Sequence, residues 1–520
     1  MEGTIYSLIP ALLMLVLVLA TRKVLLSLGA GVLIGAFMLH DFSLPQTAGE
    51  IWLVFRTIFY ADGALNTGNL YLLIFLLLLG IVTAFLTASG GSRAFGEWAI
   101  RKIKTRKGAQ LMPAVLGVII FIDDYFNSLA VGQIARPLTD RHRISRAKLA
   151  YFIDSTSAPI TVISPISSWG AYIIGTLGSI LAANEMTQYG PLQAFVAMIP
   201  LNMYAFAALL LVFLTALFKV DIGLMKTHEN RAIETGELTD PERGEVAGDL
   251  EKSFVDNERG EIHHLIIPIL LLVVATVVFM VGTGVNNTEG QADVLDVFAN
   301  TDVNLSLFWG GVIAAVGAAV LYSMQHSPKT GIGIVCWEGI KAMLPAIYIL
   351  VLAWMIGSII DSLATGEYLA DLVQQASLNT AFLPFLIFIV AGFMALATGT
   401  SWGTFGIMLP IAAEIAALTD VELVLPAMAA VLAGSVFGDH CSPISDTSIL
   451  SSTGAGSNHI DHVLTQLPYA FIAAIASVIG YLVLGVTGQT WIALLLTLAL
   501  VLVTAIYIHN QNNRTSGSNR

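Results

Sequence analysis

Long apolar stretches separated by short polar loops dominate the chain, and most are close to the roughly 20 residues that cross a bilayer as a helix. No segment alternates in the ten-residue pattern of a membrane barrel. The pattern predicts an all-α polytopic membrane protein embedded in the lipid bilayer. The expected spans are 5–20, 24–39, 70–88, 149–180, 193–218, 264–284, 305–322, 342–360, 423–450, 464–486 and 491–508.

Composition agrees with this pattern and narrows the possible partners. Of 520 residues, 56% are hydrophobic and 12% are charged, against roughly a quarter charged in a soluble domain. The Lys and Arg residues are too scattered for a nucleic-acid surface. The two cysteines, Cys336 and Cys441, indicate neither a disulfide framework nor a zinc site.

Basic residues predict the orientation of the chain, because cytoplasmic loops near spans collect Lys and Arg. Segments 93–107 and 136–148 and the loop 219–263 carry most of them and are expected in the cytoplasm, as is the C-terminus. The loops 182–192, 285–304 and 361–380 carry none and are expected outside, as is the N-terminus. We expect the protein in a bacterial-type plasma membrane.

Two segments do not fit a single crossing. Residues 111–135 would form one helix of about 37 Å, yet basic clusters place both its ends in the cytoplasm. A re-entrant hairpin with its tip near the membrane centre resolves the conflict. The same argument predicts an opposite hairpin at 381–410, since acidic loops flank it on both sides. Irregular backbone at that depth requires a surrounding protein or wet cavity.

A long apolar stretch with an interrupted middle follows each hairpin, at 149–180 and at 423–450. We expect Pro159, Pro165 and Pro443 to unwind these helices, because proline lacks an N–H and clashes with the preceding turn.

The order of elements predicts an inverted-topology repeat, the plan of many secondary transporters. Residues 1–218 and 264–486 each contain five spans and one re-entrant hairpin, beginning on opposite sides. We expect residues 219–263 to be a mobile cytoplasmic linker, residues 487–520 to add an extra C-terminal helix and tail, and residues 43–60 to form an interfacial helix.

Asp123 and Asp124 stand side by side at the predicted tip of the first hairpin. A charged group at the membrane centre costs roughly 2.5–3.5 kcal/mol on insertion scales, so these side chains need a partner or a function. Two adjacent carboxylates repel each other when ionised, and either a proton or a cation relieves the repulsion. The structural alternative is that one caps a helix and the other pairs with a base such as Arg136.

Oxygen-bearing side chains gather at both hairpins and both interruptions, which suits a hard cation such as sodium. For a single Ser or Thr, bonding a carbonyl of its own helix is the simpler role. His440 either relays protons or is satisfied by a neighbouring carbonyl, and Trp169 and Trp402 either wall the cavity or pack against the opposite repeat. The candidate ion- and substrate-binding residues are Asp123, Asp124, Asn127, Ser128, Asp154, Ser155, Thr156, Ser157, Trp169, Thr398, Thr400, Ser401, Trp402, Thr404, Asp439, His440, Ser442, Ser445, Asp446 and Thr447.

Four segments, FIDDYFNSLAVG, STSAPITVISPISSWGAYIIG, TGTSWGTFGIMLP and GSVFGDHCSPISDTSIL, resemble the NhaC-type sodium/proton antiporter family of the ion-transporter superfamily. The resemblance extends over about residues 1–508. It implies ATP-independent secondary transport, with an elevator-like movement of the hairpins and broken helices against a homodimeric scaffold. The residues it places at the site are Asp123, Asp124, Asn127, Asp154, Ser157, Thr400, Ser401, Asp439, Ser442 and Asp446. The expected sodium ligands are Asp124, Asn127, Asp154, Ser157, Asp439 and Ser442.

Several functions remain open at this point. The first is exchange of sodium for protons, with no cofactor beyond these ions, because the site is acidic and residues 342–513 contain no Lys or Arg. The second is sodium- or proton-coupled transport of a small organic acid or amino acid, whose carboxylate would sit at helix N-termini. A third is an intramembrane aspartyl protease that pairs Asp124 with Asp154 or Asp439.

Overall fold

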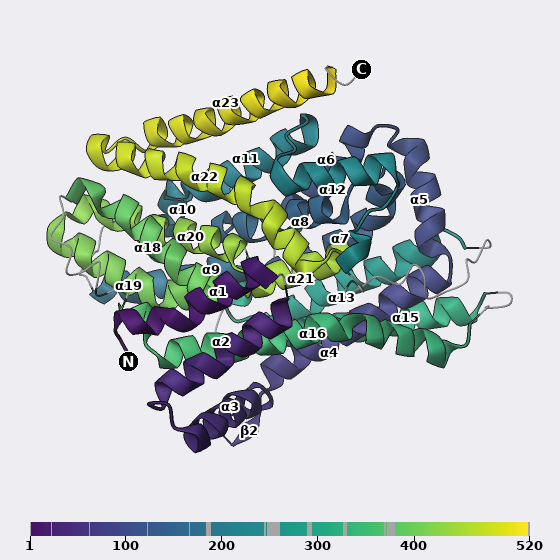
Figure 1. Cartoon of the computed structure of the whole chain (residues 1–520), viewed down its shortest axis with the longest axis horizontal. Coiled ribbons are helices and arrows are strands. Elements are labelled where there is room, and N and C mark those ends of the chain that lie inside the picture. Colours follow the sequence, from purple (N-terminus) through teal and green to yellow (C-terminus); the bar gives the residue numbers. More distant parts are fainter. Residues whose placement is uncertain are drawn as a thin grey trace.

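The computed structural model is built almost entirely from helices (Figure 1). It describes residues 2–21, 23–61, 63–121, 123–165, 167–183, 189–243, 246, 260–288, 294–325, 330–368, 371 and 380–517. The elements up to residue 243 are η1 (Ile5–Leu8), α1 (Ile9–Thr21), α2 (Val24–Leu39), α3 (Leu44–Phe59), β1 (Tyr60–Ala61), β2 (Ala64–Leu65), α4 (Thr67–Ala88), α5 (Gly91–Lys102), α6 (Arg106–Ile119), α7 (Asp124–Arg141), α8 (Arg146–Ile163), α9 (Ser168–Ala183), α10 (Pro191–Met198), η2 (Ile199–Leu201), α11 (Met203–Leu217), α12 (Gly223–Glu234) and η3 (Pro241–Arg243).

The remaining elements begin after the segment 247–259, which lies outside the described residues together with much of the predicted linker. They are α13 (His263–Asn287), α14 (Val294–Ala299), α15 (Val303–Ser323), α16 (Ile332–Ser362), η4 (Thr380–Phe382), α18 (Leu383–Thr398), α19 (Ser401–Thr419), η5 (Val421–Leu423), α20 (Val424–Cys441), α21 (Asp446–Ala455), α22 (His459–Thr487) and α23 (Thr490–Gly517).

In the described part of the chain, seven helices are long and apolar enough to cross a membrane, and two bent helix pairs each qualify as a further span. Helix α13 illustrates the kind of surface that such a helix presents to lipid. Leu270, Val274 and Val278 are more than half exposed at a spacing of four residues. That spacing places them on one helix face, which is apolar and suited to lipid. The chain is a polytopic integral membrane protein.

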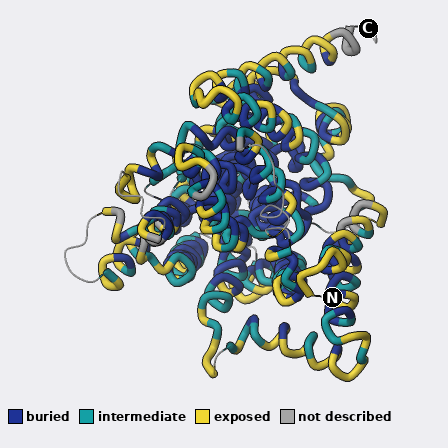
Figure 2. Tube along the Cα trace, turned by 90° about the vertical axis from the view of Figure 1, so that its left-hand side faces the viewer, coloured by how far each residue is buried: buried dark blue, intermediate teal, exposed yellow. Residues whose placement is uncertain are grey.

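The helices pack into two bundles, and each combines elements from both halves of the chain. One bundle contains α1–α4, α13, α15 and α16, in the lower part of Figure 1. The other contains α8–α11, α18–α20, α22 and α23. Buried residues concentrate in the middle of the molecule, while exposed ones lie at the periphery (Figure 2). Helices α7 and α21 pack against each other between the bundles.

Three expectations about local structure need correction. Pro159 does not interrupt its helix but lies inside α8, whereas the interruption falls at Pro165, after Ser164 has taken an extended conformation. A residue before proline disfavours the helical region, which explains the end of α8 at Ile163. The expected span 193–218 is two helices bent by 51°, because Pro200 lies at the bend and Asn202 caps α11.

The third difference concerns the linker. We expected a mobile tether from residue 219, but α12 is a packed helix in which Glu229 is only 1% exposed. Glu229 accepts bonds from Arg106 at 2.7 Å and from buried Lys148 at 3.2 Å. A carboxylate held between two cations provides a reason for this segment to dock that its composition does not reveal.

Candidate functional site

Helices α6 and α7 lie against each other, and the first residue of α6 contacts the residues that follow α7. Arg106, at the start of α6, donates to the carbonyls of His142 and Arg143 just beyond α7, at 3.3 and 3.1 Å. The chain therefore enters and leaves this pair of helices at one end, with the Asp123–Asp124 turn at the other.

Asp123 ends the turn by capping α7. Its Oδ1 accepts from the backbone N–H of Phe126 at 2.9 Å, satisfying one of the unpaired donors of a helix start. Its Oδ2 accepts from the Ser168 hydroxyl at 2.8 Å. Ser168 opens α9 directly after the interruption at Pro165, so the break in one element supplies the donor for the tip of another.

Asp124 is bonded on one oxygen only. Its Oδ1 accepts from the indole N–H of Trp169 at 3.0 Å, while its Oδ2 has no hydrogen-bond partner among the described residues although Asp124 is 2% exposed. Three residues later, Asn127 donates from Nδ2 to the carbonyls of Gly117 and Ile120, and its Oδ1 is equally unpartnered in the described structure. The first turn of α7 thus carries two buried acceptor oxygens without donors.

The second hairpin turns at Gly399 and Thr400, between α18 and α19. Gly399 has a φ of +73°, and a Cβ there would lie 2.5 Å from a side-chain atom of Ile444. Only glycine allows both the left-handed conformation and this close approach. Thr400 caps α19, and Ser401 donates to Asp439 Oδ2 at 3.1 Å.

The second interruption, between α20 and α21, brings acidic side chains to both hairpins. Asp439 Oδ2 also accepts from Thr447 at 3.3 Å, whereas its Oδ1 lacks a partner among the described residues. Asp446 accepts from the Tyr125 hydroxyl and from the backbone N–H of Thr447. Ser445 caps α21, and Ser442 donates to the Leu396 carbonyl of α18.

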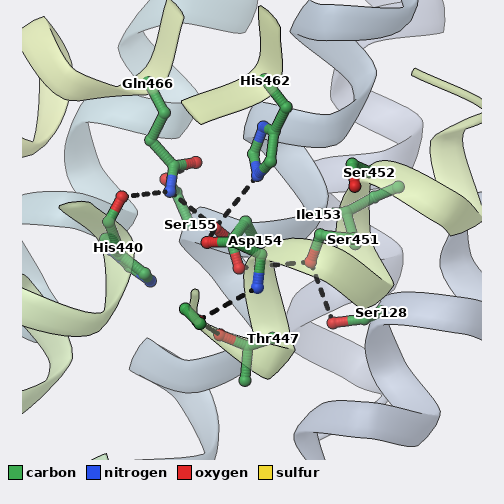
Figure 3. A network of polar contacts seen from close by, with 12 residues as sticks. Ser128, Ile153, Asp154, Ser155, His440, Thr447, Ser451, Ser452, His462 and Gln466 are labelled. Carbon is green, nitrogen blue, oxygen red and sulfur yellow. Dashed lines mark hydrogen bonds and ion pairs between the residues drawn. The ribbon is translucent and has the colours of Figure 1, made fainter. Parts of the chain in front are cut away.

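Asp154 of α8 is fully buried, with 0% exposure, in a network that sequence reasoning only partly foresaw (Figure 3). Its Oδ2 accepts from Gln466 at 2.6 Å and from His462 at 3.1 Å, both from α22. Ser448 and Ser451 of α21 donate to its two oxygens at 2.9 and 3.2 Å. This network ties the first half of the chain to the second.

His462, Gln466, Ser448 and Ser451 were not among the sequence candidates. The available signal was the spacing of His462 and Gln466, two polar residues one helical turn apart in an apolar helix. Tyr125, Ser168 and the carbonyl-binding Asn127 amide were equally hard to assign, because their partners lie on other helices.

Several of the candidate hydroxyl groups bond a backbone carbonyl nearby in the sequence, which is the simpler of the two roles considered for them. Thr156, Ser157, Thr398 and Thr404 bond carbonyls of their own helices or helix starts. Ser155 donates to the side-chain amide oxygen Oε1 of Gln466, and Ser128 accepts from Ser451. His440 meets the Tyr204 hydroxyl through Nδ1 at 3.0 Å, and its Nε2 has no partner in the part of the chain that is described.

The two tryptophans meet each other between the hairpins. Their ring centroids are 5.7 Å apart in an edge-to-face arrangement, and Trp402 also lies 4.8 Å from the ring of Tyr172. Trp169 is completely buried, and its indole N–H donates to Asp124. Trp402, in contrast, lines the cavity described next.

A cavity of about 590 Å³ opens between the hairpin tips and the α13–α15 connection. Its wall contains the four carboxylates of Asp123, Asp124, Asp302 and Asp446, and neither Lys nor Arg is among its described lining residues. Thr400, Trp402, Asn287 and Asn304 also face it.

Of the six expected sodium ligands, Asp124 is the one that lines this cavity in the described structure. The site is therefore split between a cavity wall and a buried polar interior. Among the described residues, no three His, Cys, Asp or Glu side chains converge as ligands of one metal ion.

Comparison with known proteins extends these observations. The model of the Na+/H+ antiporter family matches residues 160–486. An uncharacterized protein of Haemophilus influenzae is 47% identical over 490 residues, which cover 94% of this chain and 92% of that protein.

Two more distant relatives have specific names. A malate-2H(+)/Na(+)-lactate antiporter of Bacillus subtilis is 30% identical over 36% of this chain and 39% of its own length. An arginine/ornithine antiporter of Halobacterium salinarum is 30% identical over 37% of this chain and 39% of its own length.

Proposed function

Since the chain belongs to the Na+/H+ antiporter family, we propose that this secondary antiporter exchanges sodium ions for protons by alternating access. The observation that supports this most directly is the pair of unpartnered oxygens, Asp124 Oδ2 and Asn127 Oδ1. A buried acceptor without a donor is costly, and a proton or a hard cation satisfies it. Residues three apart on a helix share one face, so one ion can reach both oxygens.

The arrangement of elements supports an elevator-like movement of an inverted repeat. In this proposal residues 1–218 and 264–486 are the repeats, α6–α7 and α18–α19 are their re-entrant hairpins, and the bundle of α1–α4, α13, α15 and α16 is a scaffold that forms a homodimer. The hairpins and the interrupted helices then carry the ions, because Asp123 and Asp124 bond α9, while Ser401 of the second hairpin bonds Asp439 of α20. Sodium and protons are the only coupling species required.

The position of the cavity suggests which state is observed. It opens beside Asn287 and residues 301–304, which belong to the loop 285–304 that the basic-residue pattern predicts to lie outside the cell. We therefore assign the structure to an outward-facing arrangement, in which Asp124 lies in the wall of a cavity on the external side.

The test is sodium-driven proton movement in proteoliposomes that contain wild type, Asp124→Asn or Asp123→Asn. Asp124→Asn should reduce exchange at least a hundredfold, because the amide neither releases a proton nor balances a cation. Asp123→Asn should retain much more activity, since asparagine caps a helix about as well as aspartate. Wild-type exchange by a folded Asp124→Asn protein would refute the assignment.

A second candidate is exchange of a small organic acid or amino acid. The specific observation is the cavity volume, about twenty times the roughly 30 Å³ of a water molecule, beside the N-terminus of α19 with its neutral cap Thr400. An uncompensated helix start attracts a carboxylate. If sodium gradients move no protons but malate, lactate or an amino acid exchanges, this candidate replaces the first.

A further inference from the structure

The cavity wall contains four carboxylates, and most of them have hydrogen-bond partners. Asp302 caps α15 by accepting from Leu305 at 2.9 Å, and Asp123 caps α7 in the same way. Asp446 accepts from Tyr125 and Thr447. Asp124 Oδ2 is the cavity carboxylate oxygen that remains buried without a donor in the described structure.

The cavity that Asp124 lines has a volume of about 590 Å³, which is much larger than the volume of one metal ion. A hard cation requires several oxygens that converge on one point, and among the described residues no three His, Cys, Asp or Glu side chains form such a group. An ammonium group, in contrast, needs one strong acceptor and tolerates an open side, because its three donors point in different directions.

An aromatic side chain is the second feature of this cavity that suits an ammonium group. Trp402 lines the cavity and is braced by Tyr172 and Trp169 at centroid distances of 4.8 and 5.7 Å. Tryptophan is the aromatic residue that attracts cations most strongly across its face. The indole therefore favours a positively charged group attached to a carbon chain over an anion.

We propose that this cavity binds the ammonium group of a small organic amine, with Asp124 as its acceptor and Trp402 as its aromatic wall. The inference rests on the proposed function, because it treats the cavity as the transport site and names a cargo class for it. Sodium and the amine then compete for Asp124.

The binding test uses the purified full-length protein in detergent and sodium-free buffer, with n-butylammonium chloride as the probe and potassium butyrate as the anion of matched size. Butylammonium should raise the thermal unfolding temperature in a saturable manner, and butyrate should not. Asp124→Asn should weaken butylammonium binding at least tenfold, measured by calorimetry, and Trp402→Leu about fivefold.

Asp302→Asn is the matched control, because it removes a cavity charge while the asparagine still caps α15. Its effect on the affinity for butylammonium should be clearly smaller than that of Asp124→Asn, because Asp302 is not the proposed acceptor. Equal affinity in wild type and Asp124→Asn, or equal binding of butyrate, would overturn the proposal.

A competition measurement covers the case in which Asp124→Asn does not fold. In wild-type vesicles butylammonium should inhibit the measured cation exchange competitively, and absence of any inhibition would overturn the proposal. These experiments distinguish failure of the sodium/proton proposal from failure of the amine proposal. If wild type moves no protons with sodium but binds butylammonium through Asp124, the sodium assignment fails and the amine assignment stands.

Discussion

The two adjacent aspartates of the first hairpin differ in what their oxygens contact. Both oxygens of Asp123 have donors, one from its own helix and one from Ser168. Asp124 has Trp169 on one oxygen and no described partner on the other. The sequence identified this pair, because carboxylates inside an apolar segment stand out, but it could not assign their separate tasks.

The polar interior was harder to predict. Asp154 was expected at a sodium site, yet its oxygens already accept from four side chains of α21 and α22, including His462. Those donors lie about three hundred residues further along the chain, and nothing local indicates such contacts. A single sequence reveals which residues are expensive to bury, but not which partners satisfy them.

At this scale sodium and protons should compete for Asp124. Because one bound proton must leave for each cation that binds, apparent sodium affinity should fall about tenfold per pH unit once the carboxyl is protonated. Sodium-dependent exchange measured across pH 5–9 checks this. An affinity independent of pH would mean that the two ions do not share ligands.

The elements show why one proline bends the chain and another does not. Pro165 follows an extended Ser164 and falls in the gap before α9, whereas Pro159 lies within α8, which is buried along nearly its whole length. Surrounding helices can re-satisfy the carbonyl that a buried proline frees. Composition alone does not reveal how tightly a helix is enclosed.

The α6–α7 pair leads to a topology prediction. In a variant without native cysteines, Lys107→Cys and Arg141→Cys should both react with a membrane-impermeant maleimide from the cytoplasmic side, because the helix bases meet at Arg106 and His142. Asn300→Cys, near the mouth of the cavity, should react from outside. Labelling of only one of the two hairpin positions from the cytoplasm would contradict the re-entrant arrangement.

Helix α12 connects several parts of the molecule on the predicted cytoplasmic side. Glu229 bonds Arg106 of α6, Lys148 of α8 and the backbone N–H of Ser145. Burial by itself would raise the pKa of Glu229, but the charges of Lys148 and Arg106 with the Ser145 N–H hold it below its ordinary value of 4.5. The ionised carboxylate therefore stabilises the docked helix at neutral pH.

Glu229→Gln should destabilise the protein by about 3 kcal/mol, because it leaves two cations less well compensated. The folded-state pKa is lowered, so this contribution is complete well above pH 4.5 and disappears as the pH falls through the folded value. Thermal unfolding in detergent should show a difference from wild type at pH 7 that shrinks below pH 4.5. Glu234→Gln, at an exposed position of α12, is the control and should behave as wild type.

The whole molecule is held together by two apolar bundles with polar elements between them. The positions of most helices follow from the apolar stretches, since a bilayer requires lengths close to 20 residues. The pairing of first-half with second-half helices in each bundle does not follow from those stretches, because lipid-facing and protein-facing sides are both apolar. Leu270 and Leu272, neighbours on opposite sides of α13, illustrate this.

The proposed movement of the two bundles relative to each other makes a prediction at this scale. Thr83 of α4 bonds Gln133 of α7 at 3.0 Å, where the scaffold meets the first hairpin. Cysteines at both positions, joined by mercury, should reduce exchange at least tenfold, and reductant should restore it. Each single-cysteine variant should be insensitive to mercury, and undiminished flux in the cross-linked protein would argue against movement at this contact.

The contact between Trp169 and Trp402 has an optical consequence. An indole whose N–H is bonded to a carboxylate changes its emission when that carboxylate gains a proton or a cation, and Trp169 bonds Asp124 in this way. Its neighbour Trp402 faces the cavity, so cargo that touches one ring alters the surroundings of the other. The antiporter thus contains its own fluorophore at the proposed site of exchange, and occupancy of that site should be measurable without an attached dye.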